Sequence, residues 1–117
     1  SEINESVDMA YESFADDKIV PVVRLNDKLY VAELWHGPTS AFKDIALQLL
    51  PHLMIKAVEK NNIKEEMVIL VATSGDTGKS ALEGFCDVDN TKVVVYYPAN
   101  GVSDIQYKQM ATQKGMF

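Results

Sequence analysis

Hydrophobic and polar residues follow two different periods along the chain. In residues 3–14, apolar side chains recur at helical spacing between acidic ones, which predicts an amphipathic helix that packs against another element. Residues 19–24 and 28–33 are short β-favouring runs joined by Leu-Asn-Asp, which predicts a hairpin or a strand-turn-strand unit. The pattern then changes to a longer helical one.

Residues 40–60 carry apolar side chains at positions i, i+3, i+4 and i+7, the pattern of a long helix. A proline and two hydroxyl residues at 38–40 precede it, as is typical of a helix start. Pro51 lies in the middle of this helix. Because proline removes a hydrogen-bond donor, we expect a kink near Leu47.

Two further apolar runs, 67–72 and 92–97, read as buried strands, the first covered on both faces. Each precedes a predicted helix, and Ser103 with Gln106 forms a capping-box pattern for a helix over 103–114. A further strand would begin at 115–117. Alternating strands and helices predict an α/β fold, a three-layer domain with a mainly parallel sheet and helices on both faces.

The whole chain has 117 residues with 11 Lys and Arg against 17 Asp and Glu, so its formal net charge is −6. That length corresponds to one domain. Residues 1–17 form the predicted N-terminal helix and carry six acidic and no basic residues, whereas residues 18–117 form the α/β domain and are balanced. Because no basic stripe is present, we expect no nucleic-acid binding.

No apolar run approaches the roughly 18 residues that span a bilayer, and the N-terminus lacks a secretion signal, so we expect no membrane association. A lone Cys86 is consistent with a reducing compartment, and we expect a cytoplasmic protein without a metal site. Chemistry is expected in the loops at the carboxyl ends of the parallel strands.

The loop 73–78 (TSGDTG) follows the first buried strand and precedes a helix. It offers three hydroxyls, two glycines that allow close approach of backbone amides, and the positive end of a helix dipole, which together favour an anion site. An ordinary turn with Asp76 or Thr77 as the helix N-cap is the alternative. Residues 73–80 also match a nucleotide P-loop except for the first glycine, where Thr73 stands.

The segment 34–44 (LWHGPTSAFKD) places Lys43 in the first turn of the long helix. The helix dipole disfavours an added positive charge there, so the lysine sits against local preference. One reading is a solvated lysine helped by Asp44. The other is a reactive amine, which requires a lowered pKa or a carbonyl partner.

Residues 34–48 (LWHGPTSAFKDIALQ) resemble the cofactor-lysine segment of threonine synthases, which are pyridoxal-phosphate enzymes of fold type II. Residues 74–78 (SGDTG) resemble their substrate loop, and residues 101–110 (GVSDIQYKQM) match a third motif in the same order. Together the matches run through about residues 19–114. The resemblance implies conversion of O-phosphohomoserine and water to threonine and phosphate.

By this resemblance, Lys43 is the catalytic residue and holds pyridoxal 5'-phosphate as a Schiff base. Asp76 would lie near the cofactor's ring hydroxyl. The substrate carboxylate would be bound by Thr73, Ser74, Gly75 and Thr77.

The family enzymes are several times longer, and their cofactor-phosphate loop lies downstream of the matched region. The chain is therefore expected to be an inactive small-domain fragment whose partners are the substrate, the remainder of the enzyme and a second copy of itself. Two alternatives remain, a nucleotide-binding domain that uses the near P-loop and a noncatalytic interaction domain.

Overall fold

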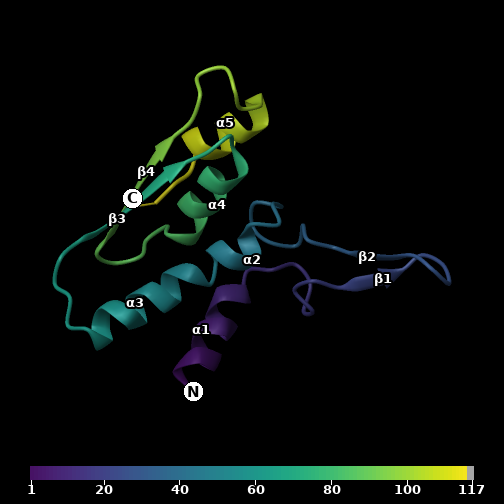
Figure 1. Cartoon of the computed structure of the whole chain (residues 1–117), viewed down its shortest axis with the longest axis horizontal. Coiled ribbons are helices and arrows are strands. Elements are labelled where there is room, and N and C mark those ends of the chain that lie inside the picture. The colour runs from purple at the N-terminus through teal and green to yellow at the C-terminus, as the bar shows by residue number, and fades with distance from the viewer. Residues whose placement is uncertain (116–117) are drawn as a thin grey trace.

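A computed structural model describes residues 1–115. The expected strand at 115–117 falls mostly outside these residues. In chain order the elements are α1 (Glu2–Tyr11), β1 (Val22–Arg24), β2 (Tyr30–Ala32), α2 (Asp44–Leu47), α3 (Leu50–Lys60), β3 (Met67–Ala72), α4 (Asp76–Gly84), β4 (Thr91–Tyr96) and α5 (Asp104–Ala111). This order of helices and parallel strands confirms the predicted α/β class (Figure 1).

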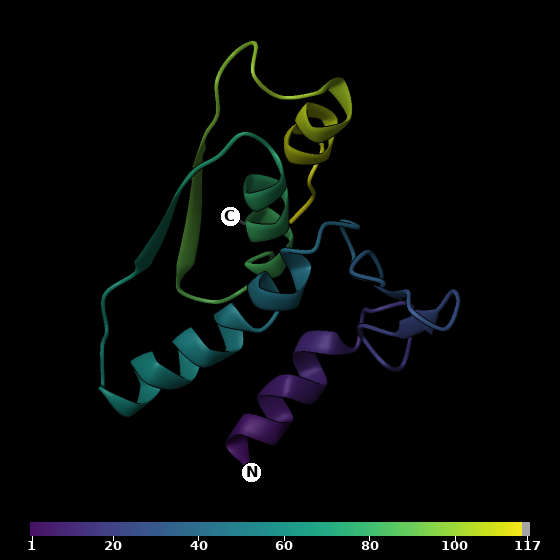
Figure 2. The ribbon, with the colours of Figure 1, turned by 45° about the vertical axis from the view of Figure 1, so that its right-hand side comes forward.

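β3 and β4 form a parallel pair whose register runs from Met67 opposite Thr91 to Ala72 opposite Tyr96. The crossover between them is α4, and α5 packs beside α4 on the same side of the strands (Figures 1 and 2). Apolar side chains from both layers meet there and are almost fully buried. They are Val71, Ala81, Phe85 and Met110.

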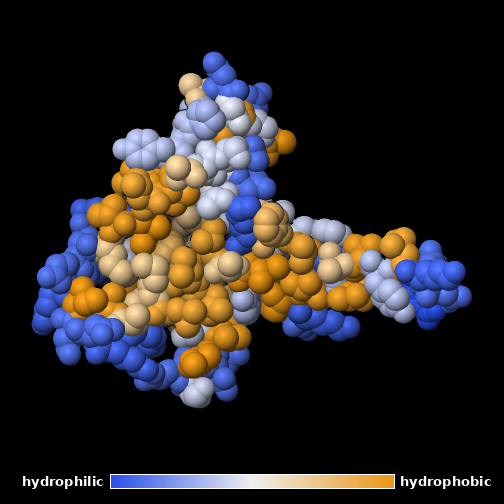
Figure 3. Space-filling view, in the orientation of Figure 1, coloured by the Kyte–Doolittle hydropathy of each residue, from blue (hydrophilic) through white to orange (hydrophobic). Residues whose placement is uncertain are grey.

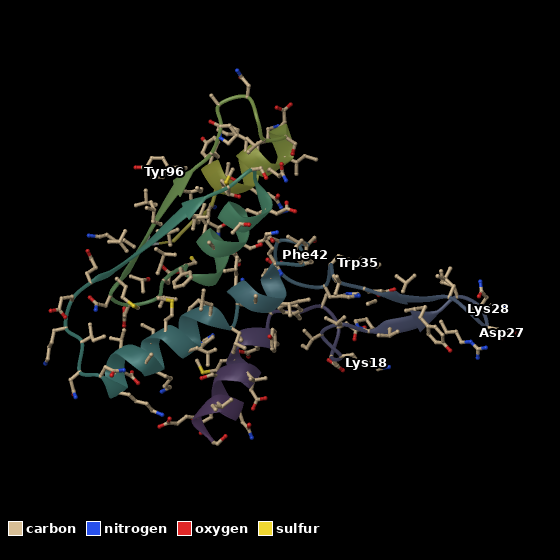
Figure 4. The ribbon with its side chains drawn as sticks, viewed as in Figure 1. Lys18, Asp27, Lys28, Trp35, Phe42 and Tyr96 are labelled. Atoms are coloured by element: carbon tan, nitrogen blue, oxygen red, sulfur yellow. The ribbon has the colours of Figure 1, made fainter. Side chains whose placement is uncertain are left out.

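The other face of this strand pair differs from the prediction of strands covered on both faces. Side chains on β3 and β4 alternate between covered and exposed, and Leu70 and Tyr96 on the open face are 69% and 64% exposed. Figure 3 shows apolar side chains gathered over this region, and Figure 4 shows Tyr96 pointing outward. The physical reason is that α1 packs against α3 instead of against the sheet.

The single long helix predicted for 40–60 is two helices, α2 and α3. Pro51 lies in the first turn of α3, where its missing N–H has no intrahelical partner to lose. The proline therefore starts a new helix instead of kinking an old one. The break falls at residues 48–49, close to the expected kink at Leu47.

The predicted hairpin is confirmed, with β1 and β2 antiparallel and Val23 opposite Val31. It projects from the rest of the molecule as an arm (Figure 1). The N-terminal helix is also confirmed as α1, which Ser1 caps through its side chain. No helix among the described residues is long and apolar enough to cross a membrane.

Candidate functional site

The loop between β3 and α4 is held by Thr73. Its hydroxyl oxygen accepts hydrogen bonds from the amides of Gly75, at 2.9 Å, and Gly78, at 3.2 Å. Gly75 is the N-cap of α4 and has φ 145°, a conformation that only glycine adopts freely. Neither Asp76 nor Thr77 is the cap, so the alternative of a side-chain-capped turn is wrong.

Asp76 is the first residue of α4, and its carboxylate is fixed from two sides. Gln106 Nε2 donates to Asp76 Oδ1 at 2.9 Å, and Lys79 Nζ lies 3.4 Å from the same oxygen. The hydrogen bond from Gln106, aided by the charges of Lys79 and Lys43, holds the pKa of Asp76 below its usual value against the opposing effect of burial. Asp76 is therefore a carboxylate at neutral pH.

Lys43 is the N-cap residue of α2 and is half-buried. Its Nζ lies 4.0 Å from the centroid of the Phe42 ring, which is exposed (Figure 4). A shallow, mainly apolar hollow brings Lys43 together with Thr77 of the loop; its lining residues are Phe42, Lys43, Ile45, Ala46, Leu47 and Thr77. Two segments that are 34 positions apart in the sequence thus share one surface.

The predicted substrate-loop residues are exposed to different degrees. Ser74 is exposed, whereas Thr73 and Thr77 are half-buried and Gly75 is buried. A Cβ on Gly75 would collide with the end of the Gln106 side chain, so another residue there would displace the amide that donates to Asp76. The structure leaves Ser74 and Thr77 open to a ligand and uses the Thr73 oxygen to shape the loop.

Behind Lys43, the segment 37–44 is joined to α4 by a buried polar cluster. Thr39 donates to Asp44 twice, from its amide at 2.8 Å and from its hydroxyl at 2.7 Å. The Thr39 hydroxyl also lies 3.0 Å from Ser80 Oγ on α4. Asp44 and Ser80 are 0% exposed. A Cβ on Gly37 would lie 2.5 Å from Asp44 Cβ, so the close turn requires glycine.

These contacts argue against the P-loop alternative. Lys79 and Ser80 would bind phosphate and magnesium in a P-loop. Here the Lys79 side chain is 10% exposed and donates to the Thr39 carbonyl at 3.2 Å, while Ser80 is buried against Thr39. Lys79 is held between the Thr39 carbonyl and the Asp76 carboxylate, and Ser80 contacts Thr39, so both side chains are already engaged within the chain.

The sequence reading did not assign Thr39, Asp44, Ser80 or Gln106 to the site. Gln106 had a signal, since it belongs to the capping box that the structure confirms at Ser103. Its second role, the bond to Asp76, depends on how α5 packs on α4 and has no local pattern. The buried cluster around Thr39 likewise forms between segments about 40 positions apart.

The fold and the two loops define the class first: an α/β unit of a fold type II pyridoxal-phosphate enzyme. Two solved structures overlie it closely. A PLP-bound threonine synthase from Brucella melitensis gives a TM-score of 0.83 and 40% identity over 93% of this chain and 23% of that one. Threonine synthase from yeast gives a TM-score of 0.81 and 35% identity over 91% of this chain and 23% of that one.

Curated relatives name the same family, although no protein-family model matches the chain. It is 43% identical to threonine synthase from Pseudomonas aeruginosa over 98% of its length and 24% of that protein. It is also 43% identical to human threonine synthase-like 1 over 92% of its length and 15% of that protein. The chain is a homologue of the threonine synthases and spans about a quarter or less of the relatives that it matches.

Proposed function

We propose that this chain supplies the cofactor lysine and the substrate loop of a threonine synthase, which converts O-phospho-L-homoserine and water to L-threonine and phosphate. The observation that carries the proposal is the hollow in which Lys43 of one motif meets Thr77 of another. Homology over nearly the whole chain supports it. The lyase class follows from the reaction, and the proposed setting is the cytoplasm.

Lys43 fits a covalent link to pyridoxal 5'-phosphate. Lys43 lines an apolar hollow, and the carboxylate of the next residue, Asp44, anchors the segment by accepting from Thr39. When bound, the cofactor supplies an electron sink for bond cleavage next to the substrate amine. Lys43 Nζ then carries protons to and from the α and β carbons of the substrate.

The loop 73–77 is proposed to bind the substrate carboxylate. Ser74 is exposed and Thr77 lines the hollow that Lys43 shares, so we propose that the hydroxyls of both residues donate to that anion. Thr73 and Gly75 are proposed to contribute by fixing the shape of the loop, since the Thr73 hydroxyl accepts from the Gly75 amide and Gly75 has φ 145°. The start of α4 adds a favourable field for negative charge.

Asp76 is proposed to face the cofactor's ring hydroxyl. Since Gln106 and Lys79 keep its carboxylate ionised, Asp76 is a hydrogen-bond acceptor and repels an ionised ring oxygen. It would therefore pair with the protonated hydroxyl. Asp76 in this role selects a protonation state of the cofactor, which a neutral side chain would not do.

We expect the 117-residue chain alone to be inactive. The matched region is about a quarter of the length of its enzyme relatives, and the hollow around Lys43 is shallow and open to solvent. A bond between Lys43 and the cofactor would be exposed to hydrolysis there, because nothing among the described residues excludes water from it. The proposed partners are the substrate and the remainder of the enzyme.

The first test is Lys43→Ala in the complete enzyme, with Lys56→Ala as the matched control because Lys56 lies on α3 and pairs with Glu59. We expect Lys43→Ala to lose essentially all phosphate release from O-phosphohomoserine and Lys56→Ala to keep it. Borohydride reduction and peptide mapping should place the cofactor on Lys43. Cofactor bound to Lys56 or Lys79 instead would disprove the assignment.

The second arm tests the loop with Ser74→Ala. A hydroxyl bonded to a charged carboxylate contributes about 1.5–3 kcal/mol, so KM for O-phosphohomoserine should rise roughly tenfold to a hundredfold. Cofactor binding to Lys43 should be unchanged. Ser13→Ala, at an exposed serine outside the loop, is the control. An unchanged KM in Ser74→Ala would remove Ser74 from the substrate site.

A further inference from the structure

Thr39 is the point at which the lysine segment and α4 are joined. Every polar group of this residue is used. Its amide and hydroxyl donate to Asp44, and its carbonyl accepts from Lys79 Nζ at 3.2 Å. Its hydroxyl also meets Ser80. Thr39 itself is only 7% exposed.

The direction of the Ser80 bond follows from the proton count. A threonine hydroxyl has one proton, and that of Thr39 is given to Asp44 Oδ1 at 2.7 Å. Ser80 must therefore donate its own proton to Thr39 Oγ1 across 3.0 Å. The result is a chain of hydrogen bonds from α4 through Thr39 to the carboxylate that follows Lys43 in the sequence.

We infer that Thr39 is a positioning residue for Lys43: through Asp44 it fixes the start of α2, and through Ser80 it sets the distance from Lys43 to the substrate loop at the start of α4. This inference rests on the proposed function. Thr39 does not line the hollow that Lys43 and Thr77 share, so its effect is indirect. Chemistry at a lysine is sensitive to displacement of about 1 Å, which costs up to roughly a hundredfold in rate.

A purely structural role makes a different prediction. If Thr39 only stabilised the fold, its removal would lower the melting temperature, but Lys43 in the folded molecules would react with the cofactor at the normal rate. If Thr39 positions Lys43, Lys43 reacts more slowly even in folded molecules. The test therefore needs a measurement on Lys43 in protein that is shown to be folded.

The experiment uses the complete enzyme with pyridoxal phosphate as the probe, and it measures the rate of borohydride-trapped attachment at Lys43 by peptide mapping. The near-isosteric Thr39→Val removes the hydroxyl, and Thr39→Ser keeps it. We expect the rate in Thr39→Val to fall about tenfold and that in Thr39→Ser to stay within about twofold of the unmodified enzyme. Thr112→Val, at an exposed threonine on the end of α5, is the matched control and should behave as the unmodified enzyme.

Ser80→Ala keeps the test decisive if Thr39→Val folds poorly, because it breaks one bond and leaves Asp44 satisfied. Its attachment rate should fall in the same direction. The double variant should be no slower than Thr39→Val, since Ser80 acts through its bond to the Thr39 hydroxyl, which Thr39→Val already removes. In both variants kcat should fall while KM for O-phosphohomoserine changes little, because the hydroxyls of the substrate loop remain in place.

The outcomes separate the two proposals. If the unmodified enzyme attaches no cofactor at Lys43, the proposed function fails. If it does so and folded Thr39→Val reacts at the same rate, or if Thr39→Ser is as slow as Thr39→Val, the positioning role of the Thr39 hydroxyl is wrong. Additive losses in the double variant would show that Ser80 and Thr39 do not act through their shared bond.

Discussion

The junction around Thr39 and the hairpin arm of β1 and β2 lie close together in the sequence and are built in opposite ways. At the junction, polar side chains are buried and mutually hydrogen-bonded, with Asp44 and Ser80 0% exposed. On the arm, apolar side chains face solvent: Val22 is 63% exposed and Tyr30 56%. Figure 4 shows the arm ending at Asp27 and Lys28, far from Phe42 at the junction.

The difference shows which part of the molecule is complete in itself. Buried polar groups are stable only when their partners are present, and the partners of Asp44 all lie within the described residues. The apolar side chains of the arm find no such cover there. The junction is therefore expected to be rigid in the chain alone, whereas the arm and the open face of β3 and β4 are surfaces that favour association.

The largest effect on stability is expected from a substitution that breaks the hydrogen bonds of the junction. Asp44→Ala leaves the amide and hydroxyl of Thr39 buried without their acceptor, and we expect a loss of about 2–4 kcal/mol in the free energy of unfolding. Chemical denaturation of the 117-residue chain measures it. Asp27→Ala is the matched control, because Asp27 pairs with Arg24 at the exposed tip of the arm and such pairs contribute little. Equal losses of unfolding free energy in the two variants would contradict the view that the junction is held by buried hydrogen bonds and the arm is not.

The arm and the junction also differ in how far the sequence predicts them. Two short β-favouring runs joined by the turn Leu-Asn-Asp are enough to predict the hairpin, because its cross-strand pairing is local. The helices α4 and α5 and the individual strands β3 and β4 were predictable because hydrophobic patterning and helix-capping residues are also local signals. The prediction of one kinked helix was wrong, because Pro51 lies in the first turn of a new helix, α3. The sequence pattern hid this break, since the helical spacing of apolar residues continues across the two residues between α2 and α3.

The junction was not predictable, although its residues lie in a recognised motif. Thr39 looked like a helix-start hydroxyl, a local role that fits its position after Pro38. Its actual partners, Asp44 and Ser80, include one that is 41 positions away. Local patterns carry no information on such a contact. Burial of the open sheet face was overestimated because an apolar run predicts a covered strand without saying what covers it.

The second prediction concerns the surface that the chain leaves uncovered. We expect the 117-residue chain to self-associate through the open face of β3 and β4, where Leu70 is 69% exposed beside Val94. Leu70→Lys places a charge in that face and should shift light scattering from oligomer towards monomer. The shift should appear at unchanged stability, because the Leu70 side chain is already in solvent.

Leu25→Lys is the matched control on the arm, where Leu25 is 59% exposed. It separates the two apolar surfaces, since it changes the same residue type to the same charge. If Leu25→Lys gives the monomer and Leu70→Lys does not, the arm is the associating surface. A chain that is already monomeric would remove the association proposal for both.

The smallest expected effect is on the pKa of Asp76, which sits beside the junction but is partly exposed. Gln106→Glu keeps the capping box of α5, since glutamate also serves at that position. It replaces the hydrogen-bond donor to Asp76 with an acceptor that carries a negative charge. We therefore expect the pKa of Asp76 to rise in the variant, with carboxyl NMR as the measurement. Gln113→Ala, which removes a glutamine bonded to Glu83 of α4, is the control and should leave the pKa of Asp76 in place.

The sign of the accompanying stability change follows from the direction of the shift. In the unmodified chain the pKa of folded Asp76 lies below the unfolded value near 3.8, so the carboxylate stabilises the fold above that pH. This contribution is lost as the pH falls through the lower, folded value. In Gln106→Glu the folded pKa of Asp76 rises towards or above the unfolded value. The stabilisation by the Asp76 carboxylate then disappears, and acid unfolding begins at higher pH. If Gln106→Glu left both the pKa of Asp76 and the acid-unfolding midpoint unchanged, Gln106 would not be what keeps the carboxylate ionised, and it would hold the loop by geometry instead of by charge.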